Sequence, residues 1–250
     1  TGETMVNIVT FDHNAPLLQR LARALLEQLP ELTGVVNNVT KSKGGSAFGE
    51  EEYLLAGKPV IREKIGDHVF EISANSFFQT NPGQAERLYQ KALQFAGLTG
   101  EEIVYDLYAG TGTISLFLSD YTRCVVGVEV IESAVKDARN NAEKNGVNNC
   151  TFVLSDVRDE FREIKTITNN YGQPDVLVLD PPRAGVHPKS LQGILELQPE
   201  RIIYISCNPA TFARDAQVLC QNKYKLQQVQ PVDMFPHTYH VELIAKLERR

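Results

Sequence analysis

Short apolar runs and amphipathic segments alternate regularly along the chain from Ile103 onward. The apolar runs have the length of buried β-strands, and the segments between them repeat their apolar residues at helical spacing. Such alternation is typical of a parallel sheet covered by helices. We therefore predict an α/β fold with a Rossmann-like sheet. The predicted strands are 103–107, 124–129, 151–154, 176–179, 202–206, 226–231 and 240–247, and the predicted helices are 84–96, 113–120, 131–145, 188–196 and 209–222.

The region before residue 76 has a different pattern, in which short apolar stretches alternate with turns. It predicts a small α+β domain over residues 1–75, followed by the larger domain over 76–250. Because its first predicted strand starts almost at residue 1, we expect the sequence to be a fragment of a longer protein. The predicted elements are strands at 5–11, 35–40 and 69–72, a helix at 16–29 and a flexible loop at 41–46.

Composition narrows the class of protein. The chain holds 250 residues, of which 42% are hydrophobic, enough for a packed core. No apolar run approaches the roughly 18 residues of a membrane helix, so we expect no membrane span. Cys124, Cys150, Cys207 and Cys220 lack metal-ligand spacing, which predicts a reducing, cytoplasmic setting with neither disulfides nor a metal site. A net charge of −6 does not indicate a nucleic-acid binder, unless the basic surface is local or lies on another part of the protein.

A turn with two glycines, Gly110 and Gly112, follows the first strand of the predicted parallel sheet. Glycines there permit a tight turn and close approach of a ligand to the backbone. Seventeen residues after Gly112, the next strand ends at Glu129, which could take a ribose diol. Ser115 replaces the third glycine of a dinucleotide fingerprint, and Asp106 before the turn would repel a pyrophosphate but suit an ammonium group. S-adenosylmethionine, which has an amino group and no phosphate, is therefore favoured over NAD or a merely structural turn.

Two further strand ends carry carboxylates. Asp156 follows the 151–154 strand, where it could reach an adenine amino group or act only as a loop acid or helix cap. Asp180-Pro-Pro-Arg183 follows the 176–179 strand, and its two prolines fix a rigid extended loop. Alternatively, this loop serves only to end the strand. Many amino-group methyltransferases place an aromatic residue after such a loop, so Arg183 in that position disfavours N-methylation.

The strand at 202–206 ends at Cys207. A cysteine at the carboxyl end of a parallel strand lies where open α/β sheets place their chemistry, although free cysteine is also often simply buried. Methylation at C5 of uracil needs a thiolate to add at C6, because C5 is a poor nucleophile, and a base to remove the C5 proton. Glu242 in the apolar last strand is the candidate base, since burial there would raise its pKa. The alternative for Glu242 is an outward-facing strand acid.

Five motifs follow one another along the chain, namely Phe78-Gln79-x-Asn81, Asp106-Leu107-Tyr108-x-Gly110-x-Gly112, Asp180-Pro181-Pro182-Arg183, Ser206-Cys207-Asn208-Pro209 and Met234-Phe235-Pro236-His237-Thr238-x-His240-Val241-Glu242. With these motifs, essentially the whole chain resembles the RNA uracil-5-methyltransferases, which modify a uridine in tRNA or 23S rRNA. The resemblance implies an S-adenosylmethionine-dependent methyltransferase with Cys207 as nucleophile and Glu242 as base. It also implies a cofactor site lined by Gln79, Tyr108, Thr113, Glu129, Asp156 and Asp180.

The resemblance further implies that residues 1–75 are the family's central domain, cut short. An N-terminal OB-like RNA-binding domain and a cysteine-held iron–sulfur cluster, which some members carry, are expected to be absent. We expect RNA as the partner of a cytoplasmic monomer, with 23S rRNA favoured over tRNA and the target uridine flipped out of its stack. Arg183 is a candidate contact to that RNA. Two alternatives stay open: an amino-group or small-molecule methyltransferase with a structural Cys207, and a non-catalytic RNA-binding module.

Overall fold

The computed structural model describes residues 1–41, 49–155 and 161–250, without the side chains of 161–165. The described chain divides into two compact units, Thr1–Phe78 and Gln79–Arg250. Within these residues, no helix combines the length and the apolar character that crossing a membrane requires.

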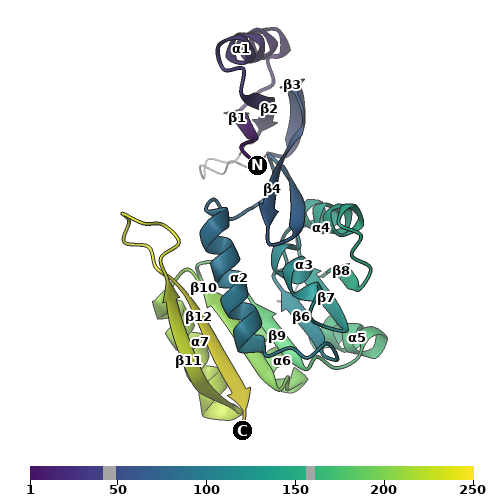
Figure 1. The fold of residues 1–250 in the computed structure, drawn as a ribbon, viewed down its shortest axis with the longest axis vertical. Coiled ribbons are helices and arrows are strands. Elements are labelled where there is room, and N and C mark those ends of the chain that lie inside the picture. The colour runs from purple at the N-terminus through teal and green to yellow at the C-terminus, as the bar shows by residue number, and fades with distance from the viewer. Residues whose placement is uncertain (42–48, 156–160) are drawn as a thin grey trace. The chain divides into compact units, whose positions relative to one another are not determined.

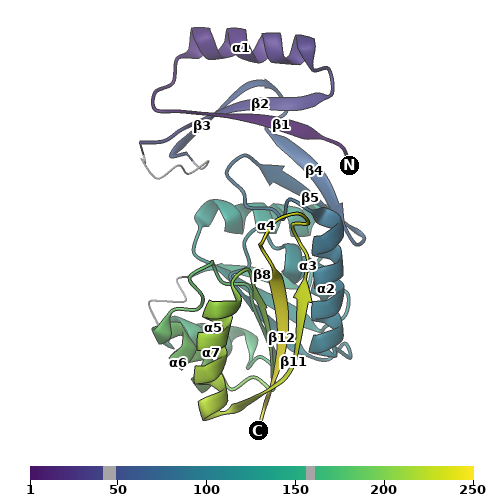
Figure 2. The same cartoon turned by 90° about the vertical axis from the view of Figure 1, so that its left-hand side faces the viewer.

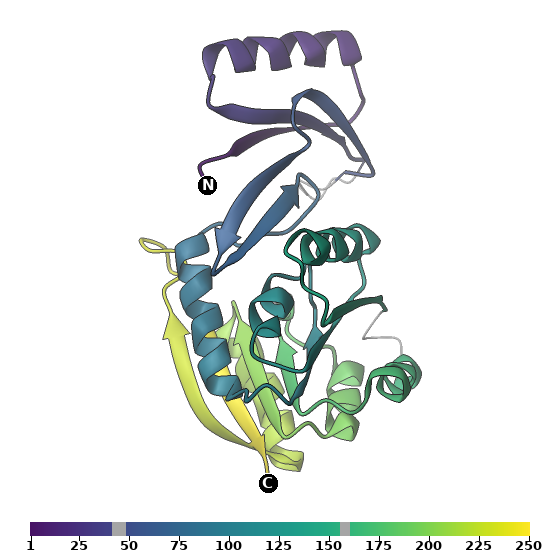
Figure 3. The same ribbon diagram turned by 45° about the vertical axis from the view of Figure 1, so that its right-hand side comes forward.

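The first unit is an α+β arrangement around a sheet with the strand order β1-β2-β3 (Figure 3). Its elements are β1 (Thr4–Thr10), α1 (Ala15–Gln28), β2 (Leu32–Val39), β3 (Glu51–Gly57), β4 (Val60–Ile65) and β5 (His68–Ser73). β1 and β2 are parallel and joined through α1, whereas β3 runs antiparallel to β2. The sequence pattern did not predict β3 or β4. β4 carries three consecutive charged residues, Arg62, Glu63 and Lys64, and pairs with β5 across a tight turn at Gly66, which has a positive φ of 59°.

The second unit is built on a seven-stranded sheet with the order β11-β12-β10-β9-β6-β7-β8 (Figure 1). The predicted Rossmann-like α/β fold is confirmed. β12 is antiparallel to both of its neighbours, while β10, β9, β6, β7 and β8 are parallel. The strands are β6 (Ile103–Leu107), β7 (Cys124–Glu129), β8 (Cys150–Leu154), β9 (Val176–Leu179), β10 (Arg201–Ser206), β11 (Tyr224–Val232) and β12 (Glu242–Arg249).

Helices cover both faces of this sheet, with α2, α3 and α4 on one side and α5, α6 and α7 on the other (Figure 2). Their bounds are α2 (Pro82–Ala96), α3 (Thr113–Ser119), α4 (Glu132–Lys144), α5 (Phe161–Tyr171), α6 (Pro188–Leu197) and α7 (Pro209–Asn222). The sequence pattern did not predict α5. β9 is apolar along its whole length and β6 is apolar except for Asp106, because both faces of these central strands lie under helices.

Candidate active site

The carboxyl ends of the parallel strands form one rim of the sheet. Tyr108 follows β6, Glu129 ends β7 and Asp180 follows β9. Leu107, the last residue of β6, pairs with the strand ends on both sides, so these three residues occupy adjacent positions along the rim. Parallel open sheets bind their ligands at this edge. Asp156, predicted on the next strand end, lies outside the described residues.

Cys207 and Glu242 continue the same rim. Ser206 pairs with Leu243 in the antiparallel ladder between β10 and β12. The residues that come next at this end are Cys207 on β10 and Glu242 on β12. The two groups also interact electrostatically, because the Glu242 charge raises the pKa of Cys207. The structure therefore brings the two predicted catalytic residues together, next to the acids of the rim.

The backbone around Cys207 is held by its neighbours. Ser206 Oγ lies 3.0 Å from the Asn208 carbonyl oxygen and 3.1 Å from the Asn208 backbone nitrogen, which donates to it. Asn208 Oδ1 accepts from the Ala210 nitrogen at 3.1 Å and so caps α7, with Pro209 at the first helical position. The Ser-Cys-Asn-Pro motif thus forms a strand-to-helix turn that fixes where the thiol points.

The pKa values of both reactive groups are raised, that of Cys207 by burial and nearby charges and that of Glu242 by burial. Burial, followed by the charges of Glu242 and Asp180, raises the pKa of the Cys207 thiol, and Arg183 opposes this. Glu242 is 6% exposed, and burial raises its pKa above the ordinary carboxyl value. The sequence expectation that Glu242 is buried is met, and the outward-facing alternative is wrong.

Asp180 is the most perturbed carboxyl of the rim. Burial, then the nearby charges of Glu242 and Asp106, raises its pKa to about 7. The loop that follows is tied to α7, since Arg183 O accepts from Asn208 Nδ2 at 3.2 Å. The Asp-Pro-Pro-Arg loop and the Cys207 turn are therefore mechanically connected.

A buried aspartate that the sequence pattern did not single out makes this connection rigid. Asp215 on α7 is fully buried and accepts from the Val186 nitrogen at 2.8 Å and from Tyr204 Oη at 2.6 Å. Arg214 pairs with it at 2.7 Å and also donates to the Val186 carbonyl at 3.3 Å. A signal was present in the sequence: Asp215 lies three residues after Phe212, on the stripe of α7 that is otherwise apolar.

Asp106 and Ser115 form a second buried pair. Ser115 Oγ donates to Asp106 Oδ2 at 2.6 Å, and both side chains are fully buried. Asp106 Oδ1 has no hydrogen-bond partner within the described part of the chain. Burial raises the pKa of Asp106 to about 6, against the effect of Ser115 and with a contribution from Glu129. Ser115, where a dinucleotide fingerprint has its third glycine, thus holds one oxygen of Asp106 and leaves the other available to a ligand.

The glycine turn is shaped to receive a ligand at one of its two glycines. Gly110 and Gly112 both have positive φ, 54° and 82°. A Cβ on Gly112 would lie 2.8 Å from Phe152 Cζ, whereas one on Gly110 would meet nothing within 4 Å. Tyr108 also has a positive φ of 80°, a strained conformation for a tyrosine. Close packing thus explains Gly112, while the space beside Gly110 is open.

Glu129 is fixed by backbone donors. Its Oε2 accepts from the Gly110 nitrogen at 2.9 Å, and its Oε1 accepts from the Val130 and Ile131 nitrogens at 2.8 and 2.9 Å. Each carboxylate oxygen can accept more than one hydrogen bond. Glu129 therefore retains acceptor capacity for a diol while its position is set by the turn.

The remaining predicted residues lie on or before the helices of the same face. Thr113, the first residue of α3, lies with its Oγ1 3.0 Å from Oη of the buried Tyr89, a residue the sequence pattern did not single out. Gln79, half-buried, precedes Asn81. Asn81 caps α2 and donates from Nδ2 to the Met234 carbonyl at 3.0 Å. The first and last motifs of the chain are joined by this contact.

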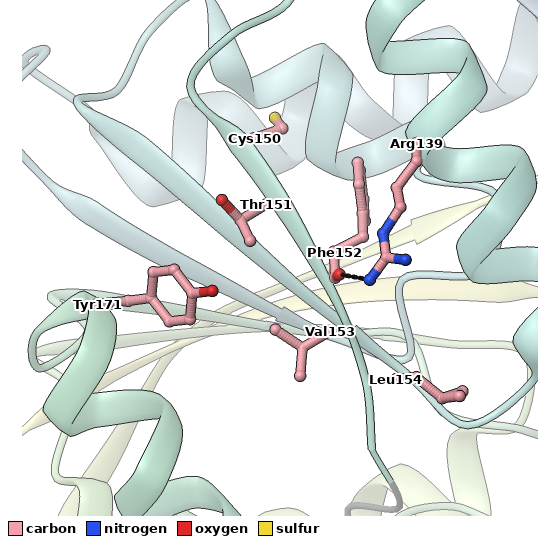
Figure 4. A pocket seen from close by; sticks show the side chains of 7 residues that line it. All are labelled: Arg139, Cys150, Thr151, Phe152, Val153, Leu154 and Tyr171. Carbon is pink, nitrogen blue, oxygen red and sulfur yellow. Dashed lines mark hydrogen bonds between the residues drawn. The ribbon is translucent and has the colours of Figure 1, made fainter.

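A surface hollow of about 540 Å³ lies elsewhere, along edge strand β8 (Figure 4). Arg139 donates from Nη2 to the Phe152 carbonyl at 2.6 Å, so a side chain occupies part of the open strand edge. Burial raises the pKa of Cys150 to about 12, which keeps that thiol protonated and unreactive. The described rim acids do not line this hollow, and we place the chemistry at the rim. The lining residues are Arg139, Cys150, Thr151, Phe152, Val153, Leu154 and Tyr171.

Comparison with known proteins gives the family. Residues 2–250 match the family described as tRNA (uracil-5-)-methyltransferase. The chain belongs to this family. Membership covers both units and all five motifs, so the predicted resemblance is confirmed at the level of the family.

Relatives in the tRNA (uracil-5-)-methyltransferase family extend further than this chain. A protein of Chlorobaculum tepidum named "uncharacterized RNA methyltransferase" is 48% identical over 99% of the chain and 51% of its own length. One of the same name from Enterococcus faecalis is 44% identical over 100% of the chain and 54% of its own length. The chain thus spans about half the length of the curated relatives it matches.

Solved structures agree with the fold. The tRNA (uracil-54, C5)-methyltransferase of Pyrococcus abyssi, solved in complex with S-adenosyl-L-homocysteine, is 35% identical, with a TM-score of 0.76 over 98% of this chain and 56% of that one. The tRNA m1G37 methyltransferase of M. jannaschii is 14% identical, with a TM-score of 0.61 over 98% of this chain and 70% of that one. The second likeness shows the fold alone.

Proposed function

We propose that the chain is the catalytic part of an enzyme that methylates C5 of a uridine in RNA, with S-adenosylmethionine as methyl donor. The observation that carries the proposal is the placement of Cys207 and Glu242 at the ends of adjacent strands, beside the acids of the rim. Alkylation of a pyrimidine at C5 requires a nucleophile and a base at one place. Membership of the tRNA (uracil-5-)-methyltransferase family supports the same reaction.

The proposed reaction uses both residues in sequence. The Cys207 thiolate bonds to C6 of the uracil, and the C5–C6 π electrons move towards the C4 carbonyl, which makes C5 nucleophilic. The bound donor supplies an electrophilic methyl group, which C5 takes as S-adenosylhomocysteine leaves. Glu242 then removes the C5 proton, and the electrons of that C–H bond restore the C5–C6 double bond and expel the Cys207 thiolate.

Burial suits Glu242 to this role. A carboxylate whose pKa is raised takes a carbon-bound proton more readily at neutral pH than one with an ordinary value. Cys207 instead requires a low pKa, because its thiolate is the nucleophile. In the structure, burial and then the neighbouring acids raise that pKa. A cationic ligand beside those acids would lower the pKa of Cys207, so we expect the thiol to become most reactive when the donor is bound.

The acids of the rim fit a positively charged ligand. Asp106 presents a buried oxygen without a partner, and the pKa of Asp180 is raised to about 7 by burial and then by the negative charges of Glu242 and Asp106, which a cation would offset. S-adenosylmethionine carries an ammonium and a sulfonium group, whereas the pyrophosphate of NAD would be repelled. We propose that Glu129 holds the ribose diol. The other residues proposed for the donor site are Gln79, Tyr108, Thr113, Asp156 and Asp180.

The proposed substrate is a uridine flipped out of its RNA, because C5 and C6 must reach the donor and Cys207 at once. We propose 23S rRNA first. A tRNA is the second candidate, favoured by the family's description and by the tRNA (uracil-54, C5) specificity of the Pyrococcus abyssi protein. With a net charge of −6 in this chain, we expect the remainder of the protein to contribute RNA affinity. Arg183, which is exposed beside the rim, is a proposed RNA contact.

Methyl transfer to transcripts of 23S rRNA and tRNA by the full-length protein tests the proposal. We expect 5-methyluridine in the digested RNA by mass analysis, and none with Cys207→Ala. Methylated exocyclic amines, with Cys207→Ala fully active, would instead indicate an amino-group methyltransferase in which Cys207 is structural. RNA binding without any turnover would indicate a non-catalytic binding module.

The donor site has its own test. S-adenosylhomocysteine should bind the protein, and its affinity should fall sharply in Glu129→Ala and less in Glu129→Gln, which keeps one acceptor oxygen. Glu132→Ala is the matched control, because that residue is exposed in the first turn of α4. Unchanged affinity in Glu129→Ala would remove Glu129 from the donor site.

A further inference from the structure

The loop between β11 and β12, residues 233–241, leads directly into Glu242 and projects beyond the ends of its two strands (Figure 1). Tyr239 near its end is 84% exposed, the largest exposed fraction among the large hydrophobic side chains of the described residues. Nothing in the proposed reaction uses this ring. Tyrosine is enriched at recognition surfaces because it joins a flat apolar ring to a polar hydroxyl.

The Tyr239 ring is supported from one side. Its centroid lies 4.3 Å from that of His240 at an interplanar angle of 35°, and Phe235 meets His240 edge-on at 6.4 Å. The three rings therefore form a cluster, here called the aromatic cluster, defined by Phe235, Tyr239 and His240. Two of its members are half-buried, and Tyr239 is the exposed end.

The backbone that carries the aromatic cluster, residues 235–240, is held in a tight turn. Thr238 donates from its nitrogen and from Oγ1 to the Phe235 carbonyl, at 3.1 and 2.7 Å. The His240 nitrogen donates to Thr238 Oγ1 at 3.2 Å, and His237 has a positive φ of 71°. The preceding Met234 is fully buried. A ring that is already oriented loses little conformational entropy when a second flat group stacks on it.

The position of Tyr239 limits what can reach it. It lies three residues before Glu242, so the two Cα atoms are at most about 11 Å apart even in a fully extended chain. Glu242 must touch the target pyrimidine if the proposed function holds. Stacked nucleotides rise roughly 3.4 Å each along a strand, so one to three nucleotides cover that span. The base that meets Tyr239 is therefore a close neighbour of the target.

We propose that the exposed face of Tyr239 is a stacking platform for an unpaired nucleobase one to three nucleotides from the target uridine. The inference rests on the proposed function. A base fits better than an apolar protein surface because the loop residues next to Tyr239 in the sequence include the polar or ionisable His237, Thr238 and His240. Every base offers a π face, so such a platform adds affinity with little sequence preference.

The test compares Tyr239→Ala, Tyr239→Phe and Tyr239→Leu in the full-length protein. RNA affinity is read by fluorescence anisotropy of a labelled single-stranded oligonucleotide with one central uridine, and 5-methyluridine formation is measured on the same RNA. Loss of one base stack is expected to weaken binding roughly 5- to 100-fold in Tyr239→Ala and Tyr239→Leu, and to raise KM more than it lowers kcat. Tyr239→Phe keeps the ring and should restore the affinity. Tyr121→Ala, which removes a 47% exposed ring just before β7, one strand in from the opposite edge of the sheet, is the matched control.

An abasic scan identifies the stacked position. Each oligonucleotide of the scan lacks one base, at one of the three positions on either side of the uridine. For one of these oligonucleotides, the affinity of wild type should fall to the affinity that Tyr239→Ala has for the intact RNA. At that position the two proteins should no longer differ. Equal affinity of wild type and Tyr239→Ala for the intact RNA, or a loss in Tyr239→Phe as large as in Tyr239→Ala, would overturn the platform.

The outcomes separate this inference from the proposed function. A loss of RNA affinity that is specific to Tyr239, with no 5-methyluridine formed by wild type, supports the platform and refutes the reaction. Normal 5-methyluridine formation with unaltered KM in Tyr239→Ala refutes the platform and leaves the reaction standing. Unaltered RNA binding with loss of a protein partner would assign the ring to a protein interface and overturn the proposal.

Discussion

Replacing Asp180 with asparagine should stabilise the folded chain at neutral and alkaline pH. The pKa of Asp180 lies near 7 against an ordinary value of 3.8, because burial and the charges of Glu242 and Asp106 disfavour its ionised form. A pKa difference of one is worth about 1.4 kcal/mol, so ionising Asp180 costs the folded state about 4 kcal/mol at most. Asp180 keeps part of its surface in water, and we therefore expect asparagine to recover about 2–4 kcal/mol.

The stability difference between Asp180→Asn and wild type depends on pH, because the pKa of Asp180 is higher in the folded state than in the unfolded state. Well below pH 4 the carboxyl is protonated in both the folded and unfolded states, so Asp180→Asn should match wild type, and at pH 4 the difference should still be small. Between pH 4 and 7 the unfolded state ionises first, so wild type loses stability relative to the variant as pH rises. Above pH 7 the difference is constant. At pH 8 it corresponds to a Tm about 4–15 °C higher for the variant.

Thermal unfolding at pH 4 and pH 8, without ligand, measures this difference. Asp233→Asn is the matched control, because Asp233 is an exposed acid near the same rim and should change the Tm by little at either pH. The asparagine at 180 should also make Cys207 easier to alkylate, since the Asp180 charge raises the pKa of that thiol. A variant that is no more stable than wild type at pH 8, or equally stabilised at both pH values, would refute the electrostatic reasoning.

Four further variants probe the supports of the rim. Ser115→Ala removes the donor to Asp106 Oδ2 and should lower the free energy of unfolding at pH 8 by about 1.5–3 kcal/mol, and by less at pH 5, in urea titrations. Gly112→Ala should cost at least about 1–3 kcal/mol in the same titrations, because it combines a positive φ with contact against Phe152. Gly110→Ala, where a Cβ meets no protein atom, should cost only the roughly 1–2 kcal/mol of its positive φ and should also impair S-adenosylhomocysteine binding in calorimetry. Asp215→Asn should lower kcat more than it raises the RNA KM in steady-state assays, since it loosens the loop beside Cys207; equal kcat would leave Asp215 a purely structural residue.

The sheet and its functional rim could be predicted from the sequence because both depend on local patterns. Each central strand is buried on both faces and is therefore a largely apolar run, with Asp106 in β6 as the exception, and the carboxyl ends of the others are marked by a polar or reactive residue. Glu129, Asp180 and Cys207 were each recognisable in this way. Neighbouring parallel strands place those ends on one edge, so sequence order alone was enough to expect the residues to be close.

What the sequence could not reveal depends on pairing between distant segments. The antiparallel direction of β12 is set by its ladders with β10 and β11, and the apolar pattern of a strand does not record its direction. β4 was missed because three consecutive charged residues, Arg62-Glu63-Lys64, break its apolar pattern, although Gly66-Asp67 is a recognisable hairpin turn. The role of Ser115 becomes visible only when the first turn of α3 lies against the end of β6.

The proposed reaction requires Cys207 and Glu242 to act in succession on one pyrimidine ring. The most direct measurement is the intact mass of the full-length Glu242→Gln variant after reaction with S-adenosylmethionine and a uridine-containing RNA. We expect a covalent protein–RNA species that is already methylated at C5 and attached through Cys207. The double variant Cys207→Ala/Glu242→Gln should form no such species. Multiple turnovers by Glu242→Gln with no such species would contradict the account.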